Sequence, residues 1–431
     1  MKIIAESLAE ASVLMSLAIA LTTGLLMSRV VKIFGMPAVT GYLIAGILIG
    51  PFCLGALDIN GIGFTSVENV GSYGVLSDLA LGFIAFAIGS EFRLESLKHT
   101  GKAATVIGCV QALTATLLVD AALIGLHFIL GDKMPLPVAI VLGAIATATA
   151  PAATLMVVKQ YKAKGKLTSL LLPIVALDDA VGLVIFAASF GVARAMQNGS
   201  VDLVSVVAEP LLEIVLSLAL GFVMGLVFSR AERFFSSNSK RLCLAVTVVA
   251  LTVAVSTLQI EIGTVHISFS PLLVCMMLGT VFCNVCDFSE DLMNRADSWT
   301  MPLYILFFVL SGADLDLNIL KDGTIVLIGA VYIIFRSLGK YLGAYGSAAI
   351  MKLDKSITHN LGITLLPQAG VALGMCMTAA KELGEDGAMI RSIVLFGVLI
   401  YELVGPTLTK GALTRAGDIT PRPVTPYDRK K

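Results

Sequence analysis

The sequence has few of the residues that soluble enzymes use for chemistry. Among 431 residues there are four histidines and one tryptophan, and only 14% of the residues are charged. So few histidines leave little scope for imidazole-based acid–base catalysis or metal binding, the usual tasks of this side chain. No GxGxxG loop, metal-ligand cluster or paired nucleophile and base occurs in the sequence. We therefore expect neither an enzyme nor a bound cofactor, and we expect no nucleic-acid partner.

Cysteine is scarce too. The seven cysteines are scattered, mostly within apolar runs, and only Cys283 and Cys286 lie close together. A single CxxC without a second pair does not complete a zinc site. We interpret the cysteines as small apolar side chains that pack in the interior.

Apolar residues are what the sequence has in abundance. They make up 57% of the chain, and the mean hydropathy is +0.92. A soluble protein of this length could not bury that much apolar surface. Apolar runs long enough to cross a bilayer recur from one end of the sequence to the other. The sequence therefore predicts an all-α polytopic membrane protein embedded in lipid.

Cutting the chain at clusters of charged and turn residues gives about thirteen transmembrane helices. The predicted spans are 8–28, 36–56, 70–90, 103–130, 135–158, 167–195, 206–228, 241–260, 264–285, 299–312, 324–350, 357–380 and 388–412. The first run is too long for a signal peptide and has no cleavage site of small residues, so we interpret it as a membrane helix. Short connections leave no room for an inserted soluble domain.

Lysine and arginine gather in alternate loops. With the N-terminus outside, most of the 30 Lys and Arg residues fall in cytoplasmic loops and in the C-terminal tail. Cytoplasmic loops carry an excess of these residues in most membrane proteins. We therefore expect the N-terminus outside, the C-terminus in the cytoplasm, and an odd number of spans.

Two spans are interrupted by proline at similar depth. Pro151 lies near the middle of span 135–158, and Pro367 lies near the middle of span 357–380. Proline removes a backbone donor and clashes with the preceding helical turn, so each residue could simply kink its helix. Each span, however, is the middle member of a triplet in its half of the chain. Matched interruptions in two halves predict inverted repeats with two crossed discontinuous helices, whose crossing marks a transporter's binding site.

Polar side chains accompany both prolines. Thr147, Thr149 and Thr154 flank Pro151, and Gln368 follows Pro367. Hydroxyl and amide groups can pair with the backbone groups that a broken helix leaves free inside a membrane. These residues are candidates for the site at the crossing.

Asp178 and Asp179 stand side by side in the apolar span 167–195. One carboxylate at the bilayer centre costs about 2.5–3.5 kcal/mol on insertion scales, so the pair must face protein or water. Either carboxylate can be neutralised by a proton or by a cation. Adjacent residues on a helix point about 100° apart, so the two aspartates should have separate roles.

Span 324–350 supplies buried positive charge. Arg336 and Lys340 lie one turn apart and so share a face of the predicted helix. Lys340 could form a structural ion pair or take part in transport, because lysine loses its charge on burial more readily than arginine. We expect Arg336 to be structural.

One aspartate is therefore expected to meet Lys340, while the other faces a water-filled funnel. Asp179, a threonine hydroxyl and freed backbone carbonyls would suit a dehydrated sodium ion, which prefers oxygen ligands. Asp120 and Glu402, in other spans, are secondary candidates that either tune this balance of charge or pair with a neighbouring helix.

Four motifs in order carry a family resemblance. They are PAVTGYLIAGILIGP (Pro37–Pro51), AIGSEF (Ala87–Phe92), LDDAVGL (Leu177–Leu183) and the Gly339–Lys340 pair. Together they resemble the monovalent cation:proton antiporter superfamily, in its bacterial Nap/Kef-type branch. The resemblance covers nearly the whole membrane domain.

The resemblance implies a homodimer in the bacterial inner membrane that exchanges sodium for protons by an elevator-type movement. It implies cation binding at Asp179, with Asp178 paired to Lys340 in the cation-free state, and electrogenic exchange. Gln368 stands where Kef-type members carry a glutamate, and this sequence contains no nucleotide-binding domain. Both differences argue against gated potassium efflux.

The resemblance also implies a division into six parts. These are first-repeat dimerisation or scaffold helices (1–102), core transport helices of repeat one (103–195), a linker helix (196–240), second-repeat scaffold helices (241–323), core helices of repeat two (324–412) and a short basic cytoplasmic tail (413–431).

Other transport functions remain open at the level of sequence. A potassium/proton antiporter or a channel-like potassium efflux protein is one alternative; a channel would need a continuous pore but no titrating carboxylate pair. A sodium-coupled symporter of an organic anion is another, and it would need more polar side chains around the helix breaks.

Overall fold

A computed structural model describes most of the chain. It covers residues 2–57, 63–90, 92, 94–198, 203–258, 260–262, 265–267, 269–286, 288–315 and 321–419. The last twelve residues of the predicted tail, 420–431, lie outside the described residues.

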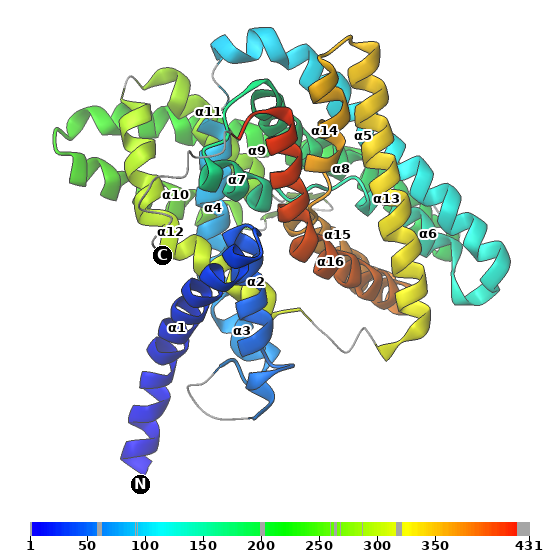
Figure 1. Cartoon of the computed structure of the whole chain (residues 1–431), viewed down its shortest axis with the longest axis horizontal. Helices are drawn as coiled ribbons and strands as arrows, with labels where there is room; N and C mark the ends of the chain where they lie inside the picture. Colours follow the sequence, from blue (N-terminus) through cyan, green and yellow to red (C-terminus); the bar gives the residue numbers. More distant parts are fainter. Residues whose placement is uncertain are drawn as a thin grey trace.

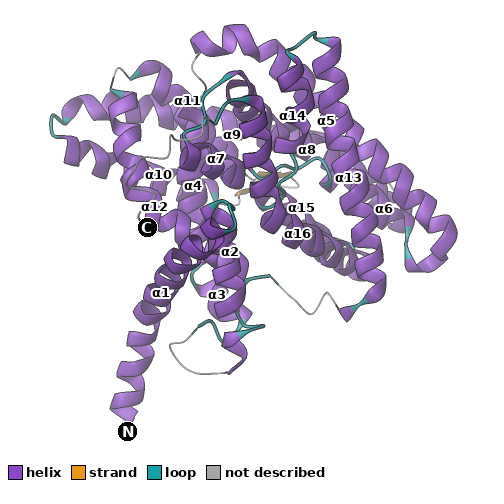
Figure 2. Cartoon of the chain, viewed as in Figure 1, coloured by secondary structure: helices purple, strands orange, loops and turns teal. Residues whose placement is uncertain are grey.

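The described part is built almost entirely of helices (Figures 1 and 2). The helices are α1 (Lys2–Ile33), α2 (Ala38–Ile49), η1 (Leu54–Leu57), α3 (Val67–Ser72), α4 (Gly74–Ser90), α5 (Leu94–Leu130), η2 (Gly131–Lys133), α6 (Leu136–Ile145), α7 (Pro151–Tyr161), α8 (Lys166–Asn198), α9 (Leu203–Ala231), η3 (Glu232–Phe234), α10 (Asn238–Ser256), α11 (Pro271–Val285), α12 (Ser289–Ala313), α13 (Gly323–Ile350), α14 (Lys355–Thr364), α15 (Gly370–Glu382) and α16 (Gly384–Ala416). One antiparallel hairpin, β1 (Ile260–Ile262) with β2 (Val265–Ile267), is the exception to the all-α prediction.

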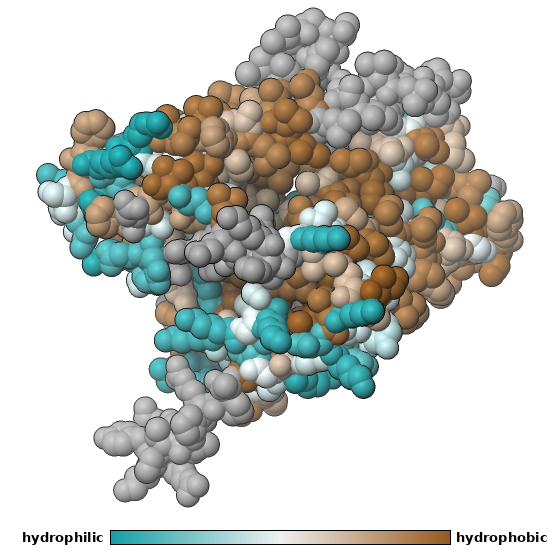
Figure 3. All heavy atoms as spheres, turned by 90° about the horizontal axis from the view of Figure 1, so that it is seen from above, coloured by the Kyte–Doolittle hydropathy of each residue, from teal (hydrophilic) through white to brown (hydrophobic). Residues whose placement is uncertain are grey.

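The helices are those of a multi-pass membrane protein. Within the described residues, eight helices are long and apolar enough to cross a bilayer, and five shorter helices are apolar as well. Hydrophobic residues cover much of the face seen in Figure 3, with hydrophilic residues gathered in separate groups along its edges. The predicted membrane class is therefore confirmed, while the number of crossings remains a prediction.

Two predicted spans differ from the observed helices. The prediction that a helix begins at 264 is wrong, because β2 occupies this stretch and α11 begins at Pro271. Ser270 caps α11 by accepting a hydrogen bond from the Leu273 backbone, and proline is favoured at the first helical position. The span predicted at 299–312 is part of the longer α12, whose first turn carries the acidic residues Glu290 and Asp291.

Both predicted helix breaks are present. α6 ends at Ile145 and α7 begins at Pro151, while α14 ends at Thr364 and α15 begins at Gly370. Ala150 is extended, as expected for a residue that precedes proline. These are interruptions of the helix rather than kinks.

The two breaks lie against each other. The Ala150 amide donates a hydrogen bond to the Pro367 carbonyl over 2.8 Å. The Gln368 side-chain amide donates to the Ile145 carbonyl over 3.0 Å. Each non-helical segment thus supplies the partners that the other lacks, and the two discontinuous helices meet at one point.

Close packing fixes α13 beside α5 at this point (Figure 1). A Cβ atom at Gly339 would lie 2.5 Å from the Ala115 Cα, and one at Gly343 would lie 2.6 Å from the Gln111 Cα. Larger side chains at these two glycines would push the helices apart. The approach carries the middle of α13 to the crossing of the broken helices.

Candidate ion-binding site

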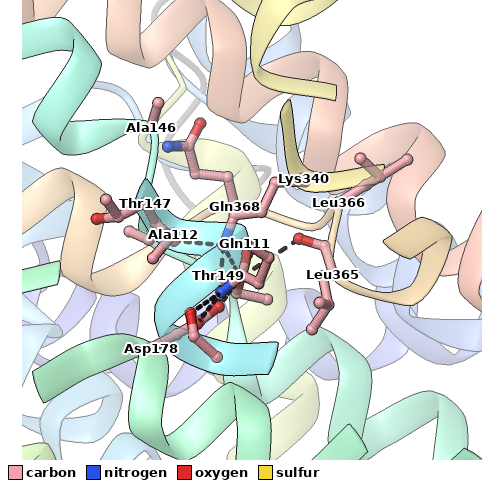
Figure 4. A network of polar contacts seen from close by, with 12 residues as sticks. Gln111, Ala112, Ala146, Thr147, Thr149, Asp178, Lys340, Leu365, Leu366 and Gln368 are labelled. Carbon is pink, nitrogen blue, oxygen red and sulfur yellow. Dashed lines mark hydrogen bonds and ion pairs between the residues drawn. The ribbon is translucent and has the colours of Figure 1, made fainter. Parts of the chain in front are cut away.

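A buried ion pair lies at the crossing. The Lys340 Nζ of α13 is 2.9 Å from the Asp178 Oδ2 of α8, and both side chains are fully buried (Figure 4). A buried charge without a partner is strongly destabilising, so each of these groups needs the other.

Asp178 has further donors. The Thr149 hydroxyl, from the break between α6 and α7, donates to Asp178 Oδ2 over 2.5 Å. The Gln111 side-chain amide, from α5, donates to Asp178 Oδ1. Lys340 also donates to the Thr149 hydroxyl over 2.9 Å and to the Thr147 carbonyl. Figure 4 shows these groups around Asp178, and they come from α5, from the break between α6 and α7, and from α13.

Asp179 has a different environment. It is 3% exposed, and its Oδ1 has no hydrogen-bond partner among the described residues. It borders a funnel of about 540 Å³, whose wall also includes Asp78 of α4 and Gly370 of α15. Asp179 therefore lies beside a water-accessible space and has one carboxylate oxygen that no described protein group satisfies.

Arg336 holds the ends of the broken helices. Its guanidinium donates to the carbonyls of Ala146 (3.0 Å), Ala148 (2.5 Å) and Leu366 (2.8 Å). The last carbonyls of a helix have no partner within that helix and carry partial negative charge. A single permanent cation therefore neutralises the C-terminal ends of α6 and α14. The guanidinium also lies 4.4 Å from the centre of the Tyr401 ring.

Three other predicted residues donate no side-chain hydrogen bond to Asp178 in the described structure. The Thr147 hydroxyl donates to the Ala144 carbonyl over 2.7 Å. Gln368 donates to the Tyr332 hydroxyl over 2.7 Å. Thr154 is buried on α7, and its hydroxyl has no hydrogen-bond partner among the described residues. Of the predicted hydroxyls, only that of Thr149 binds an aspartate.

The two secondary carboxylates lie outside the Asp178 network. Asp120 of α5 packs on Gly143 of α6, where a Cβ atom would lie 1.7 Å from the Asp120 Oδ1. That oxygen has no hydrogen-bond partner among the described residues. Glu402 is buried on α16 beside the first turn of α7.

Gln111 is the site residue that sequence reasoning missed. It is fully buried and donates to both Asp178 and the Gly108 carbonyl. The available signal was a lone amide in the apolar stretch VIGCVQALTATLLV. A polar side chain at that depth has to find a partner inside the protein.

Residues 17–414 match the family described as sodium/hydrogen exchanger, transmembrane. The chain is similar over nearly its full length to two Na(+)/H(+) antiporters of Synechocystis sp. It is 22% identical to NhaS4 over 414 residues, which cover 93% of this chain and 96% of that protein. It is 24% identical to NhaS3, described as high-affinity, over 433 residues, which cover 92% of this chain and 88% of that protein.

A shorter stretch of the chain shows a higher sequence identity to another relative. The chain is 33% identical over 162 residues to the chloroplastic K(+) efflux antiporter 2 of Arabidopsis thaliana. That stretch covers 37% of this chain and 12% of the relative, so the match spans a small part of that protein's length.

The fold matches a solved structure, the sodium proton antiporter MjNhaP1 of Methanocaldococcus jannaschii at pH 8. The TM-score is 0.69 at 18% identity, and the match covers 95% of this chain and 99% of that one. An electron-microscopy structure of the same protein gives a TM-score of 0.73 at 17% identity, with coverage of 94% and 98%. The likeness supports the antiporter fold, and the match over residues 17–414 shows that the chain belongs to the transmembrane sodium/hydrogen exchanger family.

Proposed function

We propose that this protein is a secondary transporter that exchanges sodium, or another monovalent cation, for protons. The observation that carries the proposal is the pair of adjacent buried carboxylates with different surroundings. Asp178 is held by Lys340, while Asp179 faces the funnel. The Na(+)/H(+) antiporters to which the chain is similar over more than nine tenths of its length support the same activity.

Competition for Asp179 is the proposed mechanism. The carboxylate binds either a proton or a dehydrated cation, because one oxygen site cannot hold both charges in a low dielectric. The proposed additional oxygen ligands are backbone carbonyls of the break between α6 and α7 and the Thr149 hydroxyl, which would have to leave Asp178 to reach the cation. A cation at Asp179 repels the Lys340 ammonium, which favours release of protons from the site. Exchange that uses both aspartates and Lys340 would be electrogenic.

The proposed movement is an elevator. We propose that parts 103–195 and 324–412 form a core that slides against scaffold parts 1–102 and 241–323, with 196–240 as the linker. Two large clusters of buried hydrophobic residues support this division: one is centred on α2, α4 and α12, and the other on α6, α13 and α15. The funnel lies between α8 and the scaffold helices α4 and α11.

We further propose a homodimer in a bacterial inner membrane, with the C-terminus in the cytoplasm and a role in pH homeostasis.

Potassium/proton exchange is the second candidate. It is favoured by the 33% identity over 162 residues to a K(+) efflux antiporter. Both candidates use Asp179 and differ in the cation. Proton flux driven by sodium, lithium or potassium in turn distinguishes them.

The test of the proposal is Asp179→Asn in proteoliposomes. Asparagine keeps the shape of the side chain but carries no charge, so cation-driven proton flux should fall to the level of empty liposomes. Asp291→Asn, at the exposed start of α12, is the matched control and should retain wild-type flux. Normal flux in Asp179→Asn, with the protein folded, would remove Asp179 from the mechanism.

A further inference from the structure

Glu402 of α16 is a buried carboxylate that the proposed mechanism does not use. It is 3% exposed and forms no hydrogen bond or ion pair with any described residue. Its side chain borders a cavity of about 20 Å³. The first turn of α7 (residues 150–153) and the start of α15 (residues 369–370) form one wall, and Phe307 and Phe308 of α12 form another.

Two helices therefore begin beside this carboxylate. The first amides of a helix have no partner within that helix, and the N-terminal end carries partial positive charge. Neither α7 nor α15 has a side-chain cap. The two positive ends repel a metal cation and partly offset the cost of an ionised carboxylate, whereas the apolar wall formed by Phe307 and Phe308 favours the neutral acid. Because both forms of Glu402 are accommodated, the ligand that fits this carboxylate is a proton rather than a metal cation.

The cavity adjoins the funnel of Asp179. Leu81, Leu272 and Gly370 border both spaces. A Cβ atom at Gly370 would meet no atom within 4 Å, so the wall between the Glu402 cavity and the Asp179 funnel is thin at this residue. About 10–15 Å³ is enough for one water molecule, so the cavity of about 20 Å³ has room for one water beside Glu402 but not for a hydrated cation.

No described charged group is paired with Glu402. The helices that pack on α16 or border the cavity carry Asp78 and Asp179 at the funnel, Asp178 with Lys340, Arg336 at Tyr401, Lys159 at Tyr304, and Lys355 and His359 at the start of α14. The charge of Glu402 is therefore balanced only by a proton or by the two helix ends.

We propose that Glu402 is a second proton-binding carboxylate of this exchanger, reached from the funnel past Gly370. The inference rests on the proposed function. The cavity walls come from both parts of the proposed elevator, since α7, α15 and α16 belong to the sliding core while α4 and α12 belong to the scaffold. Burying an ionised carboxylate against the rings of Phe307 and Phe308 costs free energy that the two helix ends offset only in part. Protonation of Glu402 therefore favours sliding of the core along α12.

The test combines transport with infrared spectroscopy on the full chain in lipid. In Glu402→Gln, we expect the carboxylic-acid band assigned to Glu402 to be lost from the pH difference spectrum, and the pH profile of exchange to shift. Apparent sodium affinity should stay at the wild-type value, because Glu402 does not face Asp179. Glu385→Gln, at the exposed start of the same helix, should leave both the spectrum and the profile unchanged.

A second variant tests the route without removing the carboxylate. In Gly370→Val, the Glu402 band should remain, but its exchange of hydrogen for deuterium should slow. A difference spectrum or a pH profile of Glu402→Gln that superimposes on wild type would overturn the inference. Absence of exchange in the wild type would instead refute the proposed function, whereas the infrared titration would still report whether Glu402 binds a proton.

Discussion

At the scale of single residues, the site depends on two neighbouring aspartates with unlike surroundings. Asp178 accepts hydrogen bonds from Lys340, Thr149 and Gln111. Asp179 has an oxygen without a described partner and faces the funnel. The helix itself imposes this difference, because successive side chains point about 100° apart. One aspartate is thereby held by the protein, and the other is available for the proposed exchange of ions.

Lys340→Gln should destabilise the fold. Removing one partner of a buried ion pair costs about 3–5 kcal/mol, because the other charge stays buried without compensation. The double variant Lys340→Gln/Asp178→Asn should recover part of that loss. Thermal unfolding in detergent measures the loss of stability in the single variant and its recovery in the double variant. Strictly additive losses, or an unfolding temperature of Lys340→Gln equal to wild type, would show that the pair contributes little.

The sequence predicted the charged residues of the site but not all of their partners. Carboxylates and a lysine in apolar runs are conspicuous because their burial is costly. Partners depend on which side chains meet after folding. Sequence reasoning placed a threonine hydroxyl beside Asp179, whereas the described Thr149 hydroxyl binds Asp178. Gln111 was missed because one amide in an apolar helix gives no indication of which neighbour it faces.

At the scale of elements, the broken helices determine where the charges can lie. The ends of α6 and α14 present free carbonyls, and the starts of α7 and α15 present free amides. Arg336 pairs with the carbonyls, while Glu402 lies beside the amides. Opposite charges thus occupy opposite ends of the half-helices, as their dipoles favour.

Arg336→Lys should weaken this arrangement although charge is conserved. The planar guanidinium donates to three carbonyls, whereas the single nitrogen of a lysine ammonium cannot reach all three. Each buried carbonyl left without a donor costs about 1–3 kcal/mol. We expect a lower unfolding temperature in detergent. Arg295→Lys, on the exposed part of α12, is the control; equal stability of the two variants would contradict this role of Arg336.

Helix interruptions were predictable from sequence, and some helix limits were not. Pro151 and Pro367 mark the breaks because proline cannot continue a helix without losing a hydrogen bond. The start of α11 was misplaced because Val265 and Ile267 are as apolar as a membrane helix requires. Only the cap at Ser270 and the proline after it distinguish the strand from the helix.

At the scale of the whole molecule, helices far apart in the sequence, α4, α8, α11 and α15, border the funnel. The side of the membrane on which each loop lies follows from the proposed orientation. Lys133, after α5, should face outside, and Lys162, after α7, should face the cytoplasm. Both side chains are exposed and lie at opposite ends of the span formed by α6 and α7.

Cysteine labelling tests this orientation. In a variant whose seven native cysteines are replaced, Lys133→Cys should react with a membrane-impermeant maleimide in intact cells. Lys162→Cys should react only in inverted vesicles, because positively charged loops stay in the cytoplasm. The reverse pattern would invert the orientation, and labelling of both positions in intact cells would exclude an intervening membrane.

The central claim is competition between a proton and a cation for Asp179. The most direct measurement follows radioactive sodium uptake and internal pH together in sealed proteoliposomes of the wild-type protein. Sodium uptake should drive proton efflux, and a higher proton concentration should raise the apparent KM for sodium without lowering the maximal rate. Sodium uptake at full rate with no counterflow of protons would contradict the account.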